Sequence, residues 1–160
     1  MANHKLYIED FDEIDYELIG IHTTLEAYRL AYFLNQKLPI LLSKNKKEVQ
    51  INTKEGETYF TRYFYENKEK NTTWNLIENK NKILIPKKDT TQNLFTNSDM
   101  KAAKNVFLIP EFKKVDYFLR IEDDSLEITD IVTAIHSIDW VEAAYAVDIV
   151  KIKSKNNLIF

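Results

Sequence analysis

Aromatic side chains, with one arginine among them, dominate one short stretch, in a pattern typical of a binding surface. Residues 59–65 read YFTRYFY. Because successive side chains of a strand point to opposite faces, the tyrosines should share one face, and the phenylalanines should share the other with Arg62. We expect the phenylalanine side to pack beneath a helix and the tyrosine side to face outward. The predicted binding surface consists of Tyr59, Arg62, Tyr63, Tyr65, Lys68 and Lys70.

Two kinds of partner would suit such a surface. Tyrosine-rich faces serve protein interfaces well. Aromatic platforms flanked by lysine also bind single-stranded nucleic acid by stacking, and the middle third of the chain is basic between two acidic thirds. However, the strand lacks the aromatic and glycine pattern of RNA-recognition motifs. A protein partner is therefore the preferred interpretation, and an RNA-associated role is the alternative.

Residues for catalysis or metal binding are sparse. The chain has no cysteine, which excludes disulfides, thiolate zinc sites and thiol catalysis. It has no glycine-rich phosphate loop, no GxSxG elbow and no HExxH motif. The histidines, His4, His22 and His136, are isolated in the sequence, and the carboxylates of Glu122–Asp124 precede a predicted helix that Asp124 would cap. We expect no enzyme activity, no cofactor and no metal.

The stretch IPEFKKVDY, residues 109–117, is predicted to form a turn between two strands. Pro110 cannot donate a ladder hydrogen bond and should end a strand. Glu111 can accept backbone N–H groups where the chain turns. The preferred interpretation is a β-hairpin with a carboxylate-capped turn; the alternative is that Glu111 and Asp116 converge as a ligand or metal pair.

The same stretch resembles the signature of the IPExxxVDY family, small proteins of Bacteroidota bacteria. All six fixed positions match: Ile109, Pro110, Glu111, Val115, Asp116 and Tyr117. The resemblance covers nine residues directly. It implies a bacterial, cytoplasmic origin and no particular activity.

A strand, a tight turn and an amphipathic helix are predicted twice, 101 residues apart. Residues 14–26 read IDYELIGIHTTLE and residues 115–127 read VDYFLRIEDDSLE. Each phrase contains a capping box, Thr23 with Glu26 and Asp124 with Glu127, followed by apolar residues at helical spacing. Duplication of a β-α-β unit would explain the match, although any strand-to-helix turn favours such residues.

The architecture that follows is one α+β domain spanning residues 1–160. Half-repeats 14–43 and 115–150 flank a central β-meander, residues 44–110. Residues 89–105 are predicted to be mostly loop. We expect a two-layer sandwich, a mainly antiparallel sheet with both helices on one face, in a ferredoxin-like or ACT-like layout with a pseudo-twofold axis.

Taken together, these features predict a non-enzymatic binding or adaptor domain. Its partner would be another protein or a second copy in a homodimer. A further alternative is an ACT-like small-ligand sensor that binds near Gly20–Thr24 and Glu122–Ser125. The acidic start has no apolar signal region, and the longest apolar runs are about five residues, far short of a membrane span. We therefore expect a cytoplasmic protein without membrane contact.

Overall fold

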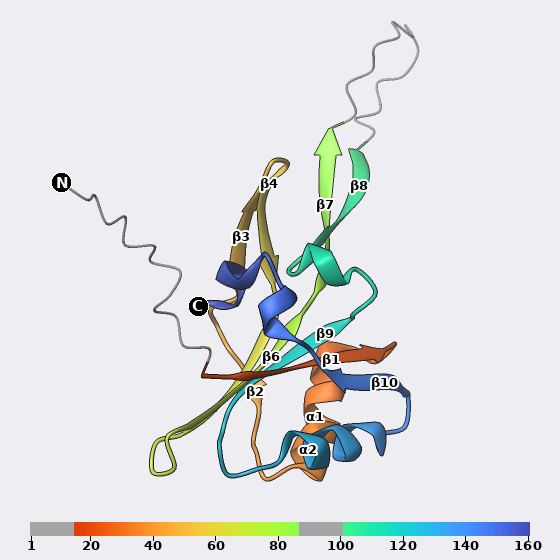
Figure 1. The fold of residues 1–160 in the computed structure, drawn as a ribbon. Coiled ribbons are helices and arrows are strands. Elements are labelled where there is room, and N and C mark those ends of the chain that lie inside the picture. Colours follow the sequence, from red (N-terminus) through yellow and green to blue (C-terminus); the bar gives the residue numbers. More distant parts are fainter. Residues whose placement is uncertain (1–14, 87–100) are drawn as a thin grey trace, which may run out of the picture.

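A six-stranded antiparallel sheet forms the centre of the fold (Figure 1). The structure is a computed structural model that describes residues 15–86 and 101–160. The strands of the sheet are β1 (Glu17–Thr23), β2 (Ser43–Lys44), β5 (Arg62–Asn67), β6 (Thr72–Glu78), β9 (Tyr117–Glu122) and β10 (Val141–Ala146). Their spatial order is β10-β1-β9-β6-β5-β2, so β10 and β2 are the two edges. No helix in the described part of the chain is long and apolar enough to cross a membrane.

Two helices cover one face of this sheet. Helix α1 (Ala27–Lys37) joins β1 to the edge strand β2, and α2 (Ile128–His136) joins β9 to the opposite edge strand β10. Their apolar faces and the facing strand residues form one core. Its fully buried members include Ile19, Ile21, Leu30, Leu34, Leu119 and Ile135. The predicted α+β class, with a mostly antiparallel sheet and two helices, is confirmed.

The second face of the sheet is also covered, which the two-layer prediction missed. Hairpins β3–β4 (Val49–Thr53, Gly56–Phe60) and β7–β8 (Lys80–Pro86, Lys101–Phe107) stand over it with the C-terminal turns η3 (Ile149–Lys151) and η4 (Lys155–Leu158) (Figure 1). These segments bury Leu18, Ile77 and Phe118 of the sheet in a second core. The extra layer arises because two strands of the sheet lead almost directly into the hairpins. The single residue Thr61 separates β4 of one hairpin from β5 of the sheet, and the single residue Asn79 separates β6 of the sheet from β7 of the other hairpin.

The predicted capping boxes are wrong at both helices. The helices begin at Ala27 and Ile128, and neither N-cap residue makes a side-chain capping bond. Thr23 still belongs to β1. Its hydroxyl oxygen accepts the N–H of Leu25, in the turn before the helix, and not an N–H of the helix itself. Of residues 89–105, predicted as loop, residues 101–105 belong to β8, and residues 89–100 lie outside the described part.

Candidate functional site

The tyrosine-rich strand alternates as predicted, but its faces are used differently. Tyr63 and Tyr65 are half-buried against the helix-side core. Phe60 is fully buried in the second core, away from the helices. The prediction of an outward tyrosine side and a phenylalanine side beneath a helix is therefore wrong. The reason is that both faces of the sheet are covered.

The remaining members of the predicted surface are dispersed. Tyr59 lies in β4, where it is 46% exposed and its hydroxyl donates to a carboxylate oxygen of Glu57. Arg62 points to the face opposite Tyr63, and Lys68 and Lys70 lie exposed in the β5–β6 turn. The six residues do not form one continuous platform. Whether any of them binds a partner stays a prediction.

The IPEFKKVDY stretch serves as internal support for the fold. Its first part forms a 3-10 turn, η2 (Pro110–Phe112), and β8 and β9 pair with other strands, so the predicted hairpin is wrong. Asn79, fully buried, holds the stretch: its amide donates to the carbonyls of Phe112 and Val115 and accepts the N–H of Ile109. The buried Tyr117 donates its hydroxyl to the carbonyl of Leu25 at 2.7 Å.

The two carboxylates of the stretch diverge. Glu111 Oε1 accepts hydrogen bonds of 3.0 Å from the N–H groups of Lys153 and Ser154 and from the Ser154 hydroxyl. Burial raises the pKa of Glu111, but hydrogen bonds with its own backbone and with Ser154 and Lys153 outweigh burial, so the net pKa lies below its ordinary value. Glu111 therefore anchors the C-terminal segment, while Asp116 bonds elsewhere. Among the described residues, no group of three or more His, Asp or Glu could hold a metal ion.

Asp116 starts a chain of hydrogen bonds that ends at an unusual tryptophan. Its Oδ2 accepts the N–H of Thr23 at 2.9 Å, and its Oδ1 pairs with Lys80 Nζ at 2.7 Å. The Thr23 hydroxyl in turn donates to the carbonyl of Trp140 at 2.7 Å. Trp140 itself is 69% exposed and has a φ of 75°. Thus one residue of the IPEFKKVDY stretch helps to fix the backbone beneath an exposed indole.

The backbone of Trp140 is strained for its residue type. It occupies the third position of a β-turn that Val141 N–H closes by donating to the carbonyl of Ile138 at 3.2 Å. Glycine or asparagine is favoured where such a turn needs a positive φ. A bulky side chain in this conformation is an outlier, and outliers cluster at functional positions. The signal in the sequence was an aromatic residue between a helix and a strand, where a turn former is expected.

Two more aromatic side chains belong to β10, the edge strand that follows Trp140, and to its neighbour β1. His22 Nε2 and Tyr145 Oη are 2.9 Å apart, with their ring centroids 5.5 Å apart. Tyr145 belongs to the edge strand β10, and burial raises its pKa. His22, Trp140 and Tyr145 are called the aromatic edge below. Sequence reasoning treated His22 as structural and did not single out the other two.

The backbone of this edge strand is partly occupied. The ring nitrogen Nε2 of His136 hydrogen-bonds to the carbonyl of Ala144 at 2.8 Å, in the middle of β10. A covered edge resists the addition of a further strand. The aromatic edge is therefore better suited to contacts through side chains than to backbone pairing.

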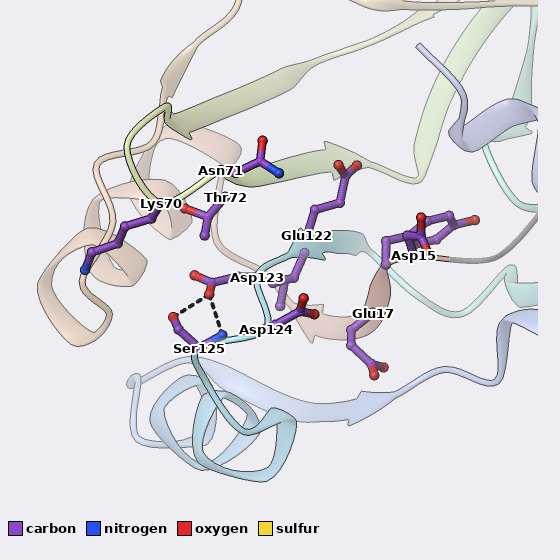
Figure 2. A pocket seen from close by; sticks show the side chains of 11 residues that line it. Asp15, Glu17, Lys70, Asn71, Thr72, Glu122, Asp123, Asp124 and Ser125 are labelled. Carbon is purple, nitrogen blue, oxygen red and sulfur yellow. Dashed lines mark hydrogen bonds between the residues drawn. The ribbon is translucent and has the colours of Figure 1, made fainter.

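A polar cleft of about 1000 Å³ lies at the N-terminal end of β1, whereas Thr23 and its bond to Trp140 lie at the C-terminal end (Figure 2). It includes the Glu122–Ser125 turn of the predicted sensor site, with Lys70 across from it. Its carboxylates are those of Asp15, Glu17, Glu122, Asp123 and Asp124. Asp123 already bonds the Ser125 N–H at 2.9 Å and the Trp74 indole at 3.2 Å. The cleft could attract a cationic group, but one of its carboxylates, Asp123, has a structural role.

Comparison with protein-family models, curated proteins and solved structures found no match for this chain. The resemblance to the IPExxxVDY family stays a prediction.

Proposed function

We propose that this chain is a non-enzymatic, cytoplasmic protein-binding module that contacts its partner through the aromatic edge. The observation that carries the proposal is Trp140, an exposed indole on a left-handed backbone. Left-handed backbone costs a non-glycine residue roughly 1–2 kcal/mol. An indole that is largely in solvent regains little of that cost by internal packing. Contact with another molecule supplies the missing reason for a tryptophan at this position.

The composition of the aromatic edge supports a protein partner. Tryptophan and tyrosine are enriched among the residues that dominate binding energy at protein interfaces. Thr23 donates its N–H to Asp116 and its hydroxyl to the Trp140 carbonyl, and these two hydrogen bonds hold the indole's backbone in place before binding. Such preorganisation lowers the entropy lost on association.

The partner is inferred to offer an apolar pocket for the indole rather than a strand for β10. His136 covers the middle of the free edge, which opposes strand addition. A second copy of the chain with such a pocket would give a homodimer, and a different protein would make this chain an adaptor.

The test is co-purification of tagged variants from the native cytoplasm, with nuclease treatment. Trp140→Gly removes the indole and suits the backbone. Tyr32→Ala is the matched control, because Tyr32 is an aromatic residue of α1 that is 58% exposed. A stoichiometric protein should be lost with Trp140→Gly and kept with Tyr32→Ala. Loss with both variants or with neither would contradict the proposal. Nuclease-sensitive material that dissociates between 50 and 200 mM salt would instead favour the RNA-associated alternative.

We also infer an internal duplication of the β-α-β unit. Supporting this, β1 and β9 are antiparallel neighbours in the sheet, with Ile19 opposite Leu119 and Leu18 opposite Arg120. The middle pair of this ladder is Ile19 opposite Leu119. These two positions are 100 apart (119 − 19), one residue from the offset of 101 at which the two phrases of the sequence align. Related sequences aligned at that offset should show more matches than shuffled controls.

A further inference from the structure

The side chains of two arginines lie close together on the sheet face opposite the helices, away from the aromatic edge. Arg62 extends from β5 and Arg120 from β9, with Asn75 of β6 paired across from Arg120. Asn75 is buried, and its Oδ1 accepts Arg62 Nε–H at 2.9 Å. Arg120 is itself largely enclosed, with 17% of its side chain exposed. These two guanidinium groups are called the arginine pair.

Aromatic rings cover the guanidinium groups of the pair. The Phe160 ring centroid lies 4.6 Å from Arg62 Cζ and 5.5 Å from Arg120 Cζ. Tyr16 stacks near Arg120 at 4.6 Å, and Phe64 near Arg62 at 5.2 Å. Such contacts engage the planar faces of a guanidinium and leave its N–H edges for hydrogen bonds.

The charges of the arginine pair are incompletely balanced. Glu122 Oε1 lies 2.6 Å from Arg120 Nη2 and is the one carboxylate paired with either arginine in the described part of the chain. Arg120 Nε is buried and has no hydrogen-bond partner among the described residues. Burial, and then the charge of Arg120, lower the pKa of Arg62. Holding two half-buried cations together with one carboxylate is costly for a purely structural arrangement.

We propose that the arginine pair binds a small planar anion, in which a carboxylate or phosphate group is attached to a flat ring. Arginine N–H edges match the oxygen spacing of both anionic groups and bind them in a bidentate way. Phe160 and Tyr16 supply faces on which the ligand's ring stacks. Glu122 acts as an internal competitor, since its carboxylate occupies one of the N–H edges that the ligand needs.

The competitor role of Glu122 makes the proposal testable with variants of opposite effect. Phenyl phosphate and benzoate are the probes for the two anionic groups, and inorganic phosphate is the probe without a ring. Titration calorimetry on the full chain would measure each affinity. Arg62→Gln should weaken binding of the preferred ring-bearing probe by about tenfold, the loss typical of one charge-assisted hydrogen bond. Glu122→Gln should strengthen it severalfold, because the site then carries no opposing charge.

The three probes also identify the ligand's chemistry. Tighter binding of phenyl phosphate than of benzoate assigns the site to phosphate esters, and the reverse assigns it to carboxylates. Inorganic phosphate should bind more weakly than phenyl phosphate, because it cannot stack. Lys113→Gln is the control, since this lysine lies near another ring, that of Phe107 at 6.0 Å. The proposal is overturned if no ring-bearing probe saturates the protein, or if Arg62→Gln and Lys113→Gln bind alike.

Discussion

Replacing Trp140 by glycine and by alanine should reverse the usual stability order of these two residues. Both substitutions remove the indole, so lost side-chain contacts affect the two variants equally. Alanine retains the cost of a left-handed backbone, roughly 1–2 kcal/mol, and glycine does not. Glycine, however, has the more flexible unfolded state, which costs it about 0.4–1 kcal/mol relative to alanine. Subtracting the central values, about 1.5 and 0.7 kcal/mol, leaves Trp140→Gly more stable than Trp140→Ala by about 0.8 kcal/mol.

The free energies of unfolding would be measured by urea titration. Trp74, which is fully buried, serves as the fluorescence reporter in both variants. Position 32 provides the control, because Tyr32 lies inside helix α1 and is similarly exposed. There, alanine should be more stable than glycine by about 1 kcal/mol, the ordinary helix order. Finding alanine more stable at position 140 as well would refute the argument that this backbone is strained.

Three further perturbations probe the supports of the fold. Asn79→Ala should cost about 2 kcal/mol or more in urea titrations, because it leaves two buried backbone groups, the carbonyl of Val115 and the N–H of Ile109, without this partner; a loss below about 1 kcal/mol would contradict this. Glu111 has a lowered pKa, so its stabilising contribution is present above its ordinary value of 4.5 and is lost as pH falls through the lower folded-state value. Glu111→Gln should therefore reduce the dependence of melting temperature on pH below 4.5. If that dependence is unchanged in the variant, Glu111 does not anchor the C-terminal segment. Gly20→Val should lower the melting temperature, since even a Cβ at Gly20 would lie 3.3 Å from Val147 Cγ2. An unchanged melting temperature would contradict this, because it would mean that the side chains around Gly20 rearrange without cost.

Local patterns in the sequence predicted the central layer of the fold well. The apolar alternation of β1 and β9 and the helical spacing after each are strong local signals, and the structure confirms the α+β class that they imply. The capping box at Thr23 failed because this residue continues the strand, where pairing with β10 overrides its local preference. The second covering layer was missed because it depends on breaks at Thr61 and Asn79, which carry no glycine or proline signal.

The candidate site was the hardest part to predict from the sequence. Tyr63 and Tyr65 resemble a binding platform in the sequence, but which face of a strand is covered depends on distant segments. Conversely, Trp140 looks like one more apolar residue until its backbone and exposure are known. Asp116 was singled out by its motif, but its role depends on Thr23, 93 residues away.

Site-specific photo-crosslinking tests the central claim most directly. A benzoylphenylalanine would replace Trp140 in one variant and Tyr32 in the other, and each would be irradiated in the native cells. The proposed function predicts one dominant crosslinked protein from position 140 and none from position 32. Equal products from both positions, or none from position 140, would contradict a binding role for the aromatic edge.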